Sequence, residues 1–200
     1  MCRTLFFSNV PIVNKLAKKL YAIVSLKRVA QIEMVPYYDL FETPIGWIAA
    51  SVSNIGLRSL SLHKTMERGL ASVQFGVAKT DPALSATLLI RDLIKSYFRR
   101  DFKALDKIPL DLTGTSPFYK RIWLECRNIP AGETRTYGSL SAIAGLARGA
   151  RAAGKALANN PILIVIPCHR VVHTTGALGG YSAGTQIKRN LLSFESMDTL

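Results

Sequence analysis

The clearest pattern in the first half of the chain is a set of short apolar runs separated by turn residues. The runs at 38–41, 47–52 and 57–62 are divided by Pro44-Ile45-Gly46 and by Asn54-Ile55-Gly56. Short apolar runs between glycine-containing turns are typical of consecutive antiparallel strands. The sequence therefore predicts a β-meander.

Helical spacing replaces this pattern later in the same half. Residues 64–80 are poorly patterned, but Asp81-Pro82 supplies an N-cap followed by proline at the first helical position. Apolar side chains then recur at helical spacing to about Arg100. Residues 108–112 contain a proline and are predicted to form a short edge strand. Residues 35–112 are therefore expected to fold as a small α/β domain.

The second half of the chain is predicted to be mostly helical. Ser116-Pro117 begins a helix whose apolar face includes Cys126, which indicates a buried core cysteine. Two further helices, at 136–146 and 147–157, are joined by a glycine-containing turn, which favours a helix-turn-helix. The unbroken apolar run at 162–166 predicts a buried strand that delivers the residues after it to an enclosed place.

Composition and charge limit the class of protein. The chain has 200 residues, of which 48% are hydrophobic, and a net charge of +13. No apolar run reaches the roughly 20 residues that span a bilayer, so no membrane partner is expected. The three cysteines include no CxxC pair, which argues against a disulfide framework and a structural zinc site and favours a reducing compartment. The positive charge indicates a polyanionic partner.

Most of this charge lies at the two ends of the chain, in residues 1–32 and 115–200. Residues 1–34 are predicted to be a separate basic extension with an amphipathic helix. That helix would touch DNA or a membrane surface, or pack as an extra helix. A transit peptide is an alternative, and translation from Met34 is another.

Cys168 is the candidate for chemistry, because a thiolate is a strong nucleophile. His169 can take the thiol proton, and His169 and Arg170 next to the sulfur would favour the thiolate. The alternative is a core cysteine beside a surface histidine, since neighbouring side chains on an extended segment point in opposite directions.

A histidine that acts as a base needs a carboxylate to orient it. Glu195 is the preferred candidate, and Glu125 and Glu133 are its competitors. The other two histidines, His63 and His173, are predicted to be surface or structural groups.

A series of short motifs spans about 80 residues of the second half. They are Ser116-Pro117-Phe118, Ile129-Pro130-Ala131-Gly132-Glu133, Tyr137-Gly138, Arg151-Ala152-Ala153-Gly154, Asn160-Pro161, Pro167-Cys168-His169-Arg170-Val171-Val172, Gly179-Gly180-Tyr181-Ser182, Lys188, Leu191-Leu192 and Glu195. Their order and spacing resemble those of the O6-alkylguanine-DNA alkyltransferases (methylated-DNA–protein-cysteine methyltransferases).

The resemblance implies a fold. We expect an α/β N-terminal domain, a small antiparallel sheet plus helix of ribonuclease-H-like type, at residues 35–112. It would be followed at residues 113–200 by a mostly helical domain with a winged helix-turn-helix. No cofactor is implied, and the zinc site of some relatives has no counterpart here.

The resemblance also implies an activity: irreversible transfer of an alkyl group from O6-alkylguanine, or O4-alkylthymine, in DNA to Cys168. His169 would withdraw the thiol proton through a water, and Glu195 would hold His169. Asn160 would support the geometry of the site. Tyr137 would press on the target phosphate and stabilise the departing guanine.

Substrate and DNA contacts follow from the same resemblance. The substrate-binding residues would be Val171, Gly179, Tyr181 and Ser182, together with the backbone carbonyl of Cys168. Arg151 would fill the gap that a flipped nucleotide leaves in the base stack. It lies on a helix whose other side chains are small enough to let it approach the minor groove. The other DNA-binding residues would be Tyr137, Ala150, Ala152, Gly154 and Lys155. Tight helix packing is the alternative explanation of this small-residue stretch.

The expected partner is double-stranded DNA that contains alkylated guanine, bound by a monomer in the cytoplasm or on the nucleoid. Leu163 and Ala183 are expected at the mouth of the pocket, where their size would favour methyl over benzyl adducts. A non-catalytic lesion sensor on the same scaffold is the main alternative, and Cys168 argues against it. A transcription regulator would need polar side chains on residues 147–157, and nothing indicates a cysteine hydrolase.

Overall fold

The computed structural model of the chain describes residues 37–72 and 81–196, of which 81–85 are described by their backbone alone. The basic helix predicted within residues 1–34 lies outside this part. Within the described part, no helix is both long enough and apolar enough to cross a membrane.

The predicted meander is confirmed. Strands β1 (Tyr37–Thr43), β2 (Gly46–Val52) and β3 (Leu57–His63) form an antiparallel sheet in the order β1-β2-β3. Gly46 has a φ of 117° at the first turn, and a Cβ there would lie 2.6 Å from the carbonyl oxygen of His63. The turn therefore requires glycine, as its sequence signal suggested.

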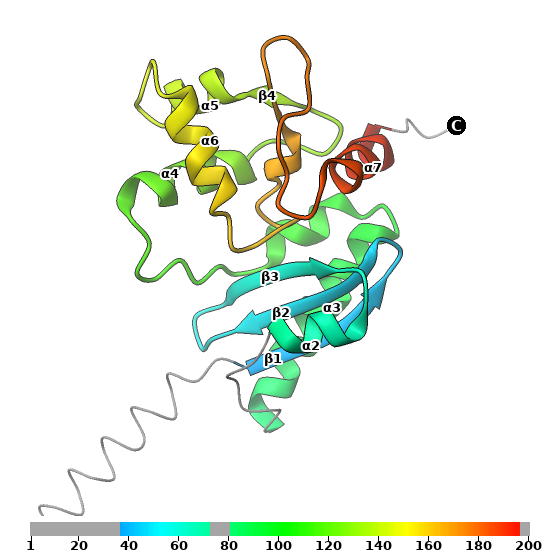
Figure 1. Ribbon diagram of the computed structural model, residues 1–200. Coiled ribbons are helices and arrows are strands. Elements are labelled where there is room, and N and C mark those ends of the chain that lie inside the picture. The colour runs from blue at the N-terminus through cyan, green and yellow to red at the C-terminus, as the bar shows by residue number, and fades with distance from the viewer. Residues whose placement is uncertain (1–36, 73–80, 197–200) are drawn as a thin grey trace, which may run out of the picture. The chain divides into compact units, whose positions relative to one another are not determined.

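Two helices pack against this sheet. Helix α3 (Asp81–Phe98) contacts β1 and β2 and confirms the predicted helix. Helix α2 (Met66–Ser72) contacts all three strands and was missed, because it is one short helix with a glycine at its centre. That residue, Gly69, packs against Leu40 of β1. Figure 1 shows α2 in front of the sheet and α3 behind it.

The outer edge of β3 holds two distant segments of the chain. After η1 (Phe102–Lys107), the amide of Leu57 donates to the carbonyl of Pro109 at 2.8 Å. Further along, the amide of Leu60 donates to the carbonyl of Pro161 at 2.8 Å. Residues 108–112 thus form a single isolated bridge to β3, less than the edge strand that was predicted.

The second half is mostly helical, as predicted. Its elements are α4 (Pro117–Arg127), β4 (Arg135–Thr136), α5 (Tyr137–Ile143), α6 (Ala150–Ala158), η2 (Cys168–Arg170), β5 (Val171–Val172) and α7 (Thr185–Ser196). Ser116 caps α4 by accepting from the amide of Tyr119 at 3.3 Å, and Cys126 is fully buried as expected. Strands β4 and β5 pair in parallel.

Helices α5 and α6 are shorter than the predicted 136–146 and 147–157. Residues 144–149 connect them, and Gly145 adopts a φ of 88° there. The two helices pack against each other, and Trp123 of α4 donates to the carbonyl of Ala156 at 2.8 Å, which fixes α6 on α4.

The strand predicted at 162–166 is wrong. Ile162 forms one bridge to Leu60 of β3, and the chain then turns, with the amide of Ile166 donating to the carbonyl of Ile162 at 3.0 Å. Ile164 has a φ of 69°, which is unusual for a β-branched residue. All five side chains are buried, so the apolar run reflects burial on every side and carries no strand periodicity.

A buried carboxylate fixes the segment that leaves the β3 edge. Asp111 accepts from Ser53 Oγ at 2.7 Å, from Arg58 Nη1 at 3.2 Å and from the amide and hydroxyl of Thr113. Burial would raise the pKa of Asp111, but these hydrogen bonds and the charge of Arg58 outweigh it and lower the pKa to about 2.

Replacing Asp111 with asparagine is expected to lower the free energy of unfolding by about 2 kcal/mol at neutral pH. A depressed pKa stabilises the folded chain above the ordinary value of about 4, and this stabilisation is lost as the pH falls toward about 2. Urea unfolding of both chains across this range measures the difference, with the exposed Asp106→Asn as a control. A difference that is independent of pH would contradict the assignment.

Candidate active site

Cys168 opens η2, directly after Pro167, with 7% of its surface exposed. Its amide donates to the carbonyl of Ile166 at 2.8 Å, and its own carbonyl accepts from the amide of Val171. The sulfur is thus held by a tight, non-repetitive turn between the buried 162–166 segment and β5.

Asn160 joins this turn to the sulfur. Its Nδ2 donates to the carbonyl of Ile166 at 2.8 Å and to Sγ of Cys168 at 3.2 Å, and its Oδ1 accepts from the amide of Ile162 at 2.9 Å. One side chain therefore fixes both ends of the segment and stabilises negative charge on the sulfur.

His169 is fully buried beside the cysteine, and its Nε2 lies 2.9 Å from Oε1 of Glu195. An ionised carboxylate can only accept, so Nε2 carries the proton and Nδ1 carries the lone pair. Within residues 37–72 and 81–196, Nδ1 has no hydrogen-bond partner. Burial lowers the pKa of His169 despite the hydrogen bond to Glu195, so the ring is a neutral base.

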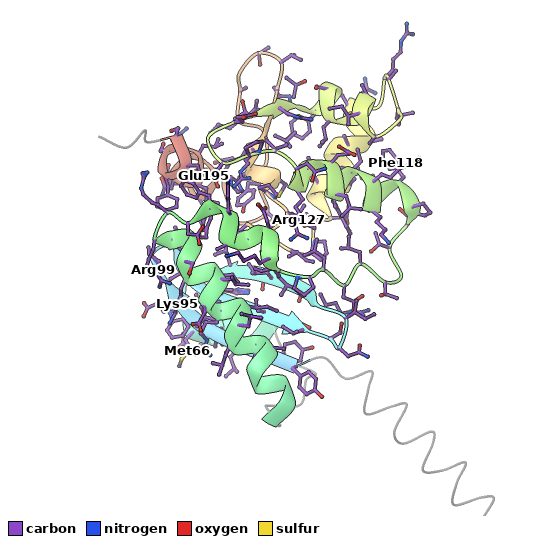
Figure 2. The ribbon with its side chains drawn as sticks, turned by 180° about the vertical axis from the view of Figure 1, so that it is seen from behind. Met66, Lys95, Arg99, Phe118, Arg127 and Glu195 are labelled. Carbon is purple, nitrogen blue, oxygen red and sulfur yellow. The ribbon has the colours of Figure 1, made fainter. Side chains whose placement is uncertain are left out.

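Glu195, which was preferred over Glu125 and Glu133, is the carboxylate that lies within hydrogen-bond distance of His169. Arg170 also holds it, donating from Nε to Oε2 at 2.9 Å and from Nη2 to Oε1 at 2.8 Å, while its Nη1 donates to the carbonyl of Ile129. Burial would raise the pKa of Glu195, but the bonds and charges of His169 and Arg170 lower it to about 2. Figure 2 shows Glu195 on α7, close to the end of α3.

The expectation that Arg170 activates the thiol is therefore corrected. Its guanidinium is bound to Glu195 and to a backbone carbonyl. Burial raises the pKa of the Cys168 thiol, and the opposing effects come from the Asn160 hydrogen bond and the charge of Lys188.

Lys188 is a residue whose role the sequence did not suggest. It is fully buried, and its Nζ donates to the carbonyl of Val171 at 2.6 Å and lies 5.9 Å from the centre of the Tyr137 ring. No carboxylate of the described residues pairs with it. A lysine in a helix is ordinarily a surface residue, so only the fold reveals a buried cation next to the thiol.

A cavity of about 630 Å³ opens over the cysteine. Helix α6 forms one wall, and the loop before α7 forms another. The residues that line it are Tyr137, Ala150, Arg151, Gly154, Leu157, Ala158, Cys168, His173, Gly180, Tyr181 and Ser182. Seven of the predicted site residues thus line one cavity, and Asn160, His169 and Glu195 are buried outside its lining.

Other predicted site residues lie outside the cavity lining. Val171 is fully buried, and its carbonyl accepts from Lys188. Gly179 has a φ of 70°, and a Cβ there would lie 2.7 Å from the Tyr137 hydroxyl. Ala152 and Lys155 lie on α6 outside the cavity lining.

The expected pocket mouth needs a correction. Neither Leu163 nor Ala183 is among the residues that line the cavity, and Leu163 is 6% exposed within the core. The predicted preference for methyl over benzyl adducts therefore loses this structural basis. His173, assigned to the surface, is exposed but also lines the cavity, with its ring 5.1 Å from that of Tyr137.

The described residues contain no group of three or more His, Cys, Asp or Glu side chains that could hold a metal ion. The site instead combines a buried thiol, Cys168, a neutral imidazole base, His169, and an ionised carboxylate, Glu195, that is hydrogen-bonded to the imidazole. Such a set can take a proton from sulfur and leave a nucleophile facing the cavity.

The chain is similar in sequence to known proteins. A family model described as "6-O-methylguanine DNA methyltransferase, DNA binding domain" matches residues 117–197. A protein of Methanosarcina acetivorans named "Methylated-DNA--protein-cysteine methyltransferase" is 35% identical over 162 residues, which cover 80% of this chain and 97% of that protein. A protein of the same name from Shigella flexneri is 40% identical over 158 residues, covering 76% and 91%.

Solved structures agree with the sequence relatives. The Mycobacterium tuberculosis protein described as OGT in complex with DNA matches with a TM-score of 0.65 and 32% identity, over 80% of this chain and 92% of that one. The O6-methylguanine methyltransferase of the same organism matches with a TM-score of 0.66 and 31% identity, over 83% and 96%.

Replacing Lys188 with methionine is expected to raise the pKa of the Cys168 thiol further, because the lysine charge that lowers this pKa is removed. The measurement is the pH dependence of modification by a small thiol reagent, with the adduct mapped to Cys168. Lys120→Met, on the exposed face of α4, is the control. The same titration midpoint in both variants would argue against an electrostatic role for Lys188.

Proposed function

The chain belongs to the methylated-DNA–protein-cysteine methyltransferase family, and we propose that it repairs DNA by moving the alkyl group of O6-alkylguanine irreversibly onto Cys168. The observation that carries this proposal is the cavity lined by Cys168, together with the next residue, His169, whose buried ring is hydrogen-bonded to Glu195. A base within a duplex cannot reach a buried thiol, so the nucleotide is flipped into this cavity.

The transfer is one displacement at carbon. The Nδ1 lone pair of His169 accepts the thiol proton through a water, and Glu195 stabilises the imidazolium that forms. Sulfur attacks the alkyl carbon, a carbon–sulfur bond forms, and the bond to O6 breaks with its electron pair moving onto guanine. Guanine takes up the proton that left the thiol, which returns His169 to its neutral form, and the thioether that remains cannot regenerate Cys168. No cofactor takes part in this balance.

Three side chains and two backbone carbonyls are proposed to receive the departing guanine. Burial raises the pKa of Tyr137, so its hydroxyl is protonated and can donate to the base. Ser182 contacts the O6 side, and Tyr181 shapes the wall of the cavity. The carbonyls of Cys168 and Val171 each accept one internal hydrogen bond and keep a second lone pair for the guanine amino group.

Helix α6 is the proposed DNA-binding element. Ala150, Ala152 and Gly154 keep its surface low enough to enter the minor groove, and Arg151 fills the stack that the flipped base leaves. Lys155 is exposed on the same helix and adds a phosphate contact. Helices α5 and α6 would form the helix-turn-helix of a winged domain at residues 113–200, preceded by a ribonuclease-H-like domain at residues 35–112.

A lesion sensor that binds without chemistry is the alternative. It is disfavoured by the thiol at the floor of the cavity and by the base behind it, because a sensor needs neither. A transcription regulator is disfavoured by α6, which offers few side chains for reading base edges in the major groove.

Incubation with an oligonucleotide that contains O6-methylguanine is expected to add one methylene mass to the intact protein, mapped to Cys168. The stoichiometry should reach one per chain, because the thioether is not turned over. Cys168→Ser should bind the same DNA without this mass, whereas Cys126→Ser should still gain it. Tight binding by the unaltered chain with no gain of mass would favour the sensor.

Arg151→Ala is expected to slow repair of duplex DNA by about tenfold or more. Without the arginine side chain, the gap in the base stack stays open and the flipped nucleotide returns to it more readily. Reaction with the free base O6-methylguanine should change little, because no flipping is needed. Arg99→Ala, on the exposed end of α3 (Figure 2), is the matched control. Equal slowing with duplex and free base would remove the role proposed for Arg151 in flipping.

A further inference from the structure

One oxygen of Glu195 accepts hydrogen bonds from three side chains. Oε1 receives Nε2 of His169 at 2.9 Å, Nη2 of Arg170 at 2.8 Å and the hydroxyl of Tyr97 at 2.6 Å. His169 and Arg170 come from the same turn as the cysteine. Tyr97 comes from α3, in the other half of the chain and 98 positions away from Glu195.

The ring of Tyr97 is packed within a cluster of aromatic side chains. The residue is fully buried, and its ring makes edge contacts with Phe98, Phe102 and Phe194, at centroid distances of 5.0, 5.6 and 5.6 Å. Phe194 directly precedes Glu195 on α7. The aromatic cluster therefore packs α3 against α7 around the Tyr97 ring.

We propose that Tyr97 is a positioning residue for alkyl transfer: its hydroxyl fixes Oε1 of Glu195 in the place from which it orients His169 toward the Cys168 thiol. This inference rests on the function proposed above and adds to it a residue that touches neither the substrate nor the sulfur. It also gives the N-terminal half of the chain a part in the reaction.

The hydroxyl also moderates the basicity of His169. Burial and the Glu195 charge raise the pKa of Tyr97, so it stays a neutral donor. A carboxylate oxygen that already accepts from Tyr97 stabilises an imidazolium less strongly than one that does not. Without the hydroxyl, Oε1 interacts more strongly with His169, which favours the protonated ring, and the carboxyl group loses one of its constraints.

Other titratable groups act on His169 and are unchanged when only this hydroxyl is removed. Arg170 and Lys188 disfavour the protonated ring. Cys168 precedes it in the chain, and the ring of Tyr181 meets it edge-on at a centroid distance of 6.2 Å. A shift in the titration of His169 after substitution of Tyr97 therefore reports on the bond to Glu195.

The test is Tyr97→Phe in the full chain, which keeps the ring and removes only the hydroxyl. The rate of methyl transfer from O6-methylguanine DNA is measured across a pH range and expressed per mole of Cys168 that can be methylated. His169 must be neutral to act, so the rate falls as the pH drops through its pKa. The acid midpoint of the variant should lie about half a unit higher, so it should react up to about threefold more slowly at mildly acidic pH.

Phe98→Leu is the matched control, because it disturbs the same aromatic cluster and leaves the hydroxyl in place. It should lower thermal stability and leave the acid midpoint unchanged. A Tyr97→Phe chain with the wild-type rate and midpoint would overturn the inference, and so would an equal shift in Phe98→Leu. A wild-type chain that transfers no methyl group would instead overturn the proposed function.

Discussion

The ionised carboxylate of Glu195 inside the core is the interaction on which the site depends. An unpaired buried charge is unfavourable by several kcal/mol, so it must be surrounded by donors. Tyr97 of α3 supplies one donor, and His169 and Arg170 of η2 supply the others. Satisfying one carboxylate therefore brings α3, η2 and α7 together, and the same packing fixes the orientation of His169.

The segment before Cys168 depends on a second set of constraints, because it has no regular secondary structure of its own. The β3 edge holds its start through Leu60, and Asn160 ties it to the sulfur. The left-handed conformation of Ile164 is unfavourable by about 1–2 kcal/mol, and it persists only where the surroundings fix the chain. Strand β3 thus fixes the segment that leads to Cys168 through backbone hydrogen bonds of Leu60, and backbone hydrogen bonds leave no motif in the sequence.

The elements that the sequence predicted correctly are those whose ends are determined by nearby residues. Turn residues and periodicity identified the three strands, α3 and α4, because glycine, proline and N-caps act within a few positions. The apolar run at 162–166 misled, since burial on all sides looks the same as a buried strand. The effect expected of Arg170 on the thiol was wrong for a different reason. Its position next to Cys168 in the sequence does not say where its side chain points, and the guanidinium binds Glu195. The roles of Tyr97 and Lys188 could not be found, because their hydrogen bonds, to Oε1 of Glu195 and to the carbonyl of Val171, are tertiary contacts that no local spacing indicates.

The raised pKa of the Cys168 thiol is compatible with its use as a nucleophile. A permanently exposed thiolate would react with any electrophile, and a protein consumed by one reaction gains nothing from such events. Burial keeps the sulfur protonated, while Asn160 and Lys188 limit how far the pKa rises. In the proposed reaction, the proton leaves only when the neutral His169 can take it, and the charge that forms on the imidazole lies against Glu195. Reactivity is therefore tied to the arrangement of the buried network, and the cavity determines which alkyl carbon reaches the sulfur.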